Sequence, residues 1–175
     1  MNRLFGALEQ QIEFIRNGGN VKRYHTKHVI HENTVAHHSF GVAYLAYLLS
    51  DMEPSVNLLM ACLSHDLSEQ ITGDVSSPTK RRFPELAAMI QTMETEELEN
   101  HELNFEAFLT DEEKKILKLA DCLDGMLYCI GEMELGNKSI FEVYNRYNKY
   151  ILQLDPQDTQ LDVLRAVLAL GVPYV

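Results

Sequence analysis

The chain has 175 residues and a formal net charge of −11, with 46% hydrophobic and 23% charged residues. This length and composition are typical of a globular protein, so we predict one domain over residues 1–175. The negative charge disfavours binding to a nucleic-acid polymer, and no apolar run is long enough to span a membrane. The start of the chain lacks the pattern of a secretory signal, which favours a cytoplasmic protein.

Hydrophobic periodicity predicts an all-α protein of about six to eight helices. Residues 20–33 and 69–83 have no clean period and are predicted to form loops. Ser55 is predicted as a helix N-cap, and Thr110 with Glu113 has the spacing of a capping box. The helices are expected at residues 2–17 (ended by Gly18-Gly19), 34–51, 55–68, 84–100, 110–134, 137–153 and 158–170. The spacing of Met89 and Met93 predicts that both lie in the core.

The stretch CLSHDLSEQITGD, residues 62–74, places charged groups at the end of an apolar helix. His65 and Asp66 end the apolar run, and Glu69 and Asp74 follow them. Burial of charge is unfavourable unless the charged groups are paired or bind a metal. Adjacent helical residues point about 100° apart, so His65 and Asp66 converge on one ion only near a helix end. The predicted loop after residue 68 provides that end.

Two other predicted helices offer further metal ligands. His37 and His38 lie at the start of the preceding helix, and Asp121 lies inside the otherwise apolar stretch KLADCLDG. Each residue alone is more often structural, but donors from three helices together favour a metal site. Two imidazoles with two carboxylates suit Zn, Mn, Co or Ni better than Ca or Mg. An open coordination position on such an ion would admit water and so favour hydrolysis.

The pattern H…HD…D on a helical chain resembles the HD-domain metal-dependent phosphohydrolases. The segments ENTVAHHS, SHDLSEQITGDVSSPTK and LAD are similar to the branch that contains bacterial 5′-deoxynucleotidases and short phage dATP triphosphohydrolases of diaminopurine genomes. Tyr24 replaces the tryptophan usual in the bacterial enzymes, and the form RYHT…TVAHHS looks closer to the phage enzymes. The resemblance covers about residues 18–125. It implies a compact HD-domain fold, a phage origin with action in the host cytoplasm, and a homo-oligomer, either a dimer or a hexamer.

The resemblance also implies roles for individual residues. The metal ligands fall on His38, His65, Asp66 and Asp121, with His37 as the alternative histidine, and the catalytic carboxylates fall on Glu69 and Asp74. Phosphate binding falls on Arg23 and Lys80. Further candidates for substrate binding come from the residues themselves: Arg81 and Lys118 for phosphate oxygens, and Gly19 and Tyr24 for the sugar and base.

The function implied is a metal-dependent hydrolase of deoxynucleotides. Its sharper form converts dATP to deoxyadenosine and triphosphate by metal-hydroxide attack at the α-phosphate, with Zn, Co or Mn as the ion and further divalent ions on the phosphates. One alternative is a 5′-deoxynucleotidase acting on deoxynucleoside monophosphates. A second is a nucleotide-binding HD domain without turnover, which Glu69 and Asp74 disfavour because such a domain has no need of proton-transfer groups. No motif indicates the base preference or the native metal.

Overall fold

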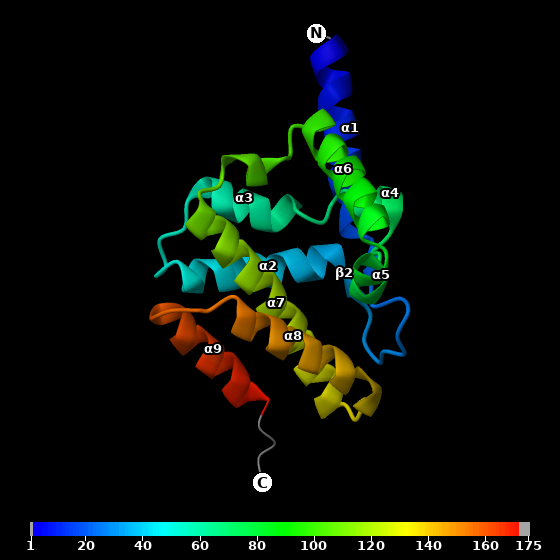
Figure 1. Ribbon diagram of the computed structural model, residues 1–175. Helices are drawn as coiled ribbons and strands as arrows, with labels where there is room; N and C mark the ends of the chain where they lie inside the picture. Colours follow the sequence, from blue (N-terminus) through cyan, green and yellow to red (C-terminus); the bar gives the residue numbers. More distant parts are fainter. Residues whose placement is uncertain (1, 172–175) are drawn as a thin grey trace.

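The computed structural model describes residues 2–171, and the prediction of an all-α protein is confirmed. Helices α2 and α7 cross at the centre, with α3 on one side of them and α8 and α9 on the other (Figure 1). The elements in chain order are α1 (Asn2–Gly19), β1 (Lys22–Arg23), β2 (Asn33–Thr34), α2 (Val35–Leu49), α3 (Val56–Ser64), α4 (Glu69–Thr72), α5 (Ser77–Arg82), α6 (Pro84–Asn100), η1 (Phe105–Phe108), α7 (Asp111–Glu134), η2 (Lys138–Ile140), α8 (Phe141–Gln153) and α9 (Thr159–Leu170).

The main hydrophobic core lies where α2, α3 and α7 meet. Val42 and Leu58 are almost fully buried there, as are Leu123 and Met126 of α7. Burial of each such side chain stabilises the fold by about 1.5–3 kcal/mol. Because the predicted metal ligands lie on α2, on α7 and directly after α3, this core fixes the relative positions of those ligands.

The predicted helix starts are confirmed by their caps. Ser55 Oγ accepts a hydrogen bond from Leu58 N at 3.0 Å. Thr110 Oγ1 accepts from Glu113 N at 3.2 Å while the Glu113 carboxylate accepts from Thr110 N at 2.9 Å, which completes the capping box. Each cap satisfies backbone N–H groups that a helix leaves without partners.

The structure differs from the predicted loops and helix ends in three places. The helix predicted at residues 55–68 ends at Ser64, and short helices α4 and α5 lie within the predicted loop 69–83. Gly73, with φ 69°, ends α4, and Pro78 near the start of α5 suits a first helical turn. In the predicted loop 20–33, β1 and β2 pair antiparallel. These pieces are too short to give a periodic sequence pattern.

Several apolar side chains lie on the surface. Met89 and Met93 of α6 are 63% and 41% exposed, so the prediction that they lie in the core is wrong. On α1, Ile12 is exposed while Phe14 is buried, and the start of this helix extends beyond the rest of the molecule (Figure 1).

Within residues 2–171, no helix combines the length and hydrophobicity needed to cross a bilayer.

Candidate metal and catalytic site

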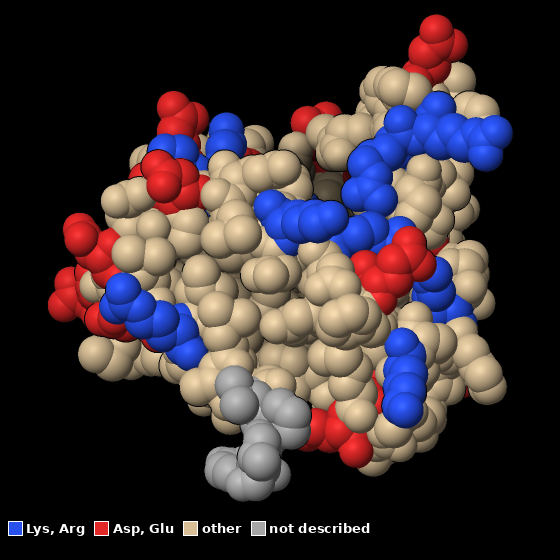
Figure 2. Space-filling view, turned by 60° about the horizontal axis from the view of Figure 1, so that its bottom comes forward, with Lys and Arg blue, Asp and Glu red and all other residues tan. Residues whose placement is uncertain are grey.

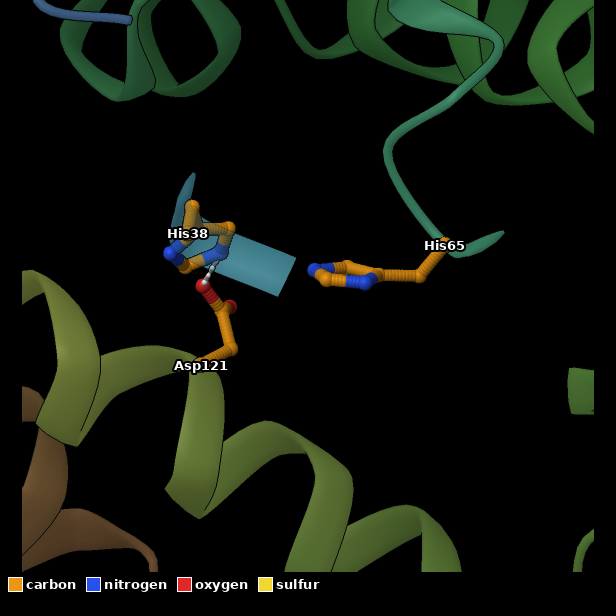
Figure 3. A group of neighbouring side chains, drawn as sticks. All are labelled: His38, His65 and Asp121. Atoms are coloured by element: carbon orange, nitrogen blue, oxygen red, sulfur yellow. Dashed lines mark ion pairs between the residues drawn. The ribbon is translucent and has the colours of Figure 1, made fainter. Parts of the chain in front are cut away.

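Three of the predicted ligands converge from three separate elements. His38 lies in α2, His65 directly follows α3, and Asp121 lies in α7; their side chains point toward one another (Figure 3). One ligand atom from each lies within 4.8 Å of the other two. His37 is exposed, and its backbone N–H donates to the N-cap residue Thr34. His38, rather than His37, therefore faces the cluster.

Hydrogen bonds on the far side of each imidazole fix which nitrogen faces the cluster. His38 Nδ1 lies 2.6 Å from Asp124 Oδ2, and His65 Nδ1 lies 3.0 Å from the carbonyl oxygen of Cys62. Both partners accept, so both Nδ1 atoms donate. In the neutral imidazole, which is the form that binds a metal, each Nε2 then presents a lone pair. Both Nε2 atoms are buried without a hydrogen-bond partner among residues 2–171. Buried lone pairs that converge in this way fit a metal ion.

The carboxylates complete the donor set. Asp121 Oδ1 lies 3.3 Å from His38 Nε2, while its Oδ2 accepts from Lys118 Nζ at 2.7 Å. Asp66 Oδ2 lies 3.6 Å from His38 Nε2 and 3.4 Å from His65 Nε2, and it also accepts from the Arg23 guanidinium. The four predicted ligands therefore meet at one place, with Asp66 held at its edge by Arg23.

The electrostatics of the cluster suit a cation. Burial and Arg23 lower the pKa of His38, but the nearby carboxylates of Asp121 and Asp124 outweigh them and raise it to about 9. Burial raises the pKa of Asp121, yet Lys118 and His38 hold it well below its ordinary value. Ionised carboxylates that bind a proton this tightly also stabilise a divalent cation, and two imidazoles with carboxylates match a borderline transition metal.

Glu69 and Asp74 lie beside the ligands. Burial, together with the charges of Asp66 and Asp74, raises the pKa of Glu69 to about 9. Glu69 Oε2 is buried and has no hydrogen-bond partner among the described residues. Asp74 Oδ2 accepts from the backbone N–H of Tyr24 at 3.2 Å. A carboxyl group with a raised pKa beside a metal site can transfer protons at neutral pH.

A pocket of about 980 Å³ opens beside this cluster. Figure 2 shows lysine and arginine side chains around a hollow on one face of the molecule. Gly19 does not line the pocket; it is buried in α1 and faces the Ala36 side chain. The other predicted substrate-binding residues all line it: Arg23, Tyr24, Lys80, Arg81 and Lys118.

The structure adds site residues that sequence reasoning missed. Asp124 orients His38, and a Cβ atom at Gly41 would collide with the Asp124 carboxylate, so glycine is needed there. Asp124 lies three residues after Asp121 on the same helix, a spacing that signals a shared face. The pocket wall formed by α8, which includes Arg146 and Lys149, carries no sequence motif.

Comparisons with known proteins show the family to which the chain belongs. A family model described as "5′-deoxynucleotidase YfbR-like" matches residues 11–164. The chain belongs to this family. It is therefore an enzyme, as the sequence predicts. A 5′-deoxynucleotidase of Yersinia pestis (strain Pestoides F) is 25% identical over 169 residues, covering 84% of each chain.

Two solved structures share the fold. An HD-domain phosphohydrolase from Listeria innocua has a TM-score of 0.75 at 23% identity and covers 94% of this chain and 89% of its own. The HD phosphohydrolase DatZ of cyanophage S-2L has a TM-score of 0.73 at 19% identity, covering 91% of this chain and 95% of its own. The cyanophage protein was solved with dA and one catalytic Zn²⁺ ion.

Proposed function

We propose that this protein dephosphorylates deoxynucleotides with a bound divalent metal, and that its preferred reaction converts dATP to deoxyadenosine and triphosphate. The observation that carries the proposal is the convergence of His38 Nε2, His65 Nε2 and Asp121 beside a pocket lined with cations. The family match supports the substrate class, and the dA and Zn²⁺ bound to the cyanophage protein support the base and the metal.

The residues proposed to hold the ion are His38, His65 and Asp121, with Asp66 as the fourth ligand. Zn, Co or Mn suits this mixture of imidazole and carboxylate, and further divalent ions would accompany the phosphates of the substrate. When bound, such an ion lowers the pKa of water and polarises the phosphate.

The remaining residues position the substrate and move protons. Arg23 and Lys80 bind oxygens of the α-phosphate, Arg23 with its planar fork. Glu69 accepts a proton from the attacking water as its oxygen bonds to the α-phosphorus. The bond between that phosphorus and the 5′-oxygen breaks, and Asp74 donates a proton to the leaving oxygen. Without a metal the pKa of Glu69 is about 9; a bound divalent cation would lower it, which would suit a proton acceptor.

The alternative function is a 5′-deoxynucleotidase that acts on deoxynucleoside monophosphates. The family description and the Yersinia relative favour it, because both are named for that activity. The two functions place the same reaction at the α-phosphate and differ in whether the pocket binds the remaining phosphates.

A product assay separates these functions. The purified chain is incubated with Co, Mn or Zn and each dNTP, NTP and dNMP, and the products are resolved by chromatography. Deoxyadenosine and intact triphosphate from dATP alone are the expected result. Phosphate release from several dNMPs, with the dNTPs intact, would replace the proposal by the alternative. No turnover with any metal would favour a nucleotide-binding domain.

We also propose a cytoplasmic homo-oligomer, either a dimer or a hexamer. Four apolar side chains of α1 form an exposed stripe at spacings of three and four residues, the spacing of a coiled-coil seam. Exposed stripes of this kind mark protein contacts. The stripe consists of Phe5, Leu8, Ile12 and Ile15, which are 71%, 49%, 58% and 41% exposed.

A further inference from the structure

Helix α8 forms a wall of the pocket to which the proposed reaction assigns no role. Arg146 and Lys149 line the pocket together with Tyr147 and Tyr150. Residues three and four apart lie on one face of a helix, so these four side chains form a continuous surface. Another part of the lining comes from β1 and α5, which carry Arg23, Lys80 and Arg81.

The charge of this pocket contrasts with the charge of the chain. The lining includes seven of the 15 lysine and arginine residues, against four carboxylates, in a protein whose net charge is −11. A local excess of cations on an acidic protein indicates an anionic ligand. The cations are Arg23, Lys27, Lys80, Arg81, Lys118, Arg146 and Lys149, and the carboxylates are Asp66, Glu69, Asp74 and Asp121.

The cations differ in how strongly site carboxylates already engage them. Arg23 is paired with Asp66, and Lys118 with Asp121. Lys149 is exposed and forms no ion pair among residues 2–171. The nearest carboxylate oxygen to Arg146 belongs to the exposed Glu142, at 3.7 Å. Exposed ion pairs of that length stabilise little, so both α8 cations can bind an anion without losing a strong partner.

We propose that Arg146 and Lys149 form a subsite for the phosphates beyond the α-phosphate, which makes α8 the element that selects triphosphates. The inference rests on the proposed function. In the proposed function, Arg23 and Lys80 already bind the single phosphate of a monophosphate, so they leave Arg146 and Lys149 for further phosphates. A pocket of about 980 Å³ has room for a nucleotide with its phosphate chain. The β- and γ-phosphates would then contact α8 while the α-phosphate reacts at the metal cluster.

The test compares kcat/KM for dATP and dAMP in the double variant R146Q/K149Q. The control is K115Q/R165Q, which makes the same charge change at exposed positions away from this pocket. We expect the ratio of kcat/KM for dATP to that for dAMP to fall about tenfold in the first variant and to stay unchanged in the control. An equal loss of kcat/KM for dATP and dAMP in R146Q/K149Q, or no loss for either, would overturn the subsite.

A binding measurement tests the subsite without turnover. Calorimetry with inorganic triphosphate and inorganic phosphate is carried out on the wild-type chain and on both variants. We expect triphosphate to bind the wild-type chain more tightly than phosphate, and its Kd to rise about tenfold in R146Q/K149Q only. An unchanged Kd would overturn the subsite even if the enzyme were active. If no nucleotide were turned over but this binding pattern held, the proposed function alone would fail.

Discussion

At the scale of single residues, Glu69 carries the proton transfer in the proposed reaction. It lies beside the ligands without being one of the three that converge. We therefore expect Glu69→Gln to bind metal like the wild-type chain and to lose about 10²–10⁴-fold in kcat. Metal content and kcat are measured on the same samples, with Glu96→Gln as an exposed control on α6. Full activity in Glu69→Gln would show that Glu69 does not transfer the proton.

In the proposed site, Asp124 would act on a bound metal through His38. Its carboxylate accepts the Nδ1 proton of His38 and so directs the Nε2 lone pair toward Asp121. Loss of such a partner lowers metal affinity about 10–100-fold. We expect this loss in Asp124→Ala, measured by competition with a chelator, and no change in Asp162→Ala, whose carboxylate is exposed on α9. Equal affinities in the two variants would contradict the positioning role.

At the scale of elements, the sequence predicted what local interactions determine. The caps at Ser55 and Thr110 depend on residues three positions apart, so they are visible in the sequence. The His65-Asp66 pair was recognisable because charge at the end of an apolar helix is unusual. The α8 wall depends on tertiary packing against α7 and carries no local pattern, so it could not be predicted. The exposure of Met89 could not be predicted for a similar reason, because helical spacing does not reveal which face of a helix packs against the rest of the protein.

Glu132 of α7 holds the loop that follows β1. Its buried carboxylate accepts from the backbone N–H groups of Ile30 at 2.8 Å and His31 at 2.7 Å, and from Asn137 Nδ2 at 2.6 Å. Burial raises the pKa of Glu132, but these hydrogen bonds outweigh burial and lower it below its ordinary value of 4.5. The bonds therefore stabilise the fold above about pH 4.5, and this contribution is lost as the pH falls through the lower folded pKa.

We expect Glu132→Gln to reduce the free energy of unfolding by about 2 kcal/mol at pH 7. The glutamine NH₂ group would replace one acceptor oxygen of the carboxylate and would face a backbone N–H, so that one hydrogen bond is lost. The difference from the wild-type chain should narrow as the pH falls below 4.5. Urea unfolding at several pH values measures it, and Glu134→Gln, exposed on the same helix, is the control. A difference that does not depend on pH would show that Glu132 acts through packing alone.

At the scale of the whole molecule, the exposed stripe of α1 predicts self-association. Ile12→Glu places a charge in the middle of the stripe, and we expect it to lower the molar mass in light scattering toward that of a single 20.0 kDa chain. Val56→Glu changes an exposed apolar side chain on α3, outside the α1 stripe, and should leave the mass unchanged. A wild-type chain that is already monomeric would contradict the oligomer.

The central claim is that an ion held by His38, His65 and Asp121 is required for dephosphorylation, and a metal titration tests it most directly. The chain is stripped with a chelator and then titrated with Zn, Co or Mn, while bound metal and deoxyadenosine released from dATP are measured in the same samples. We predict no turnover in the stripped chain and turnover that rises with the amount of bound metal. In His65→Ala we predict neither tight metal binding nor turnover. Turnover by the stripped chain, or by His65→Ala without metal, would contradict the account.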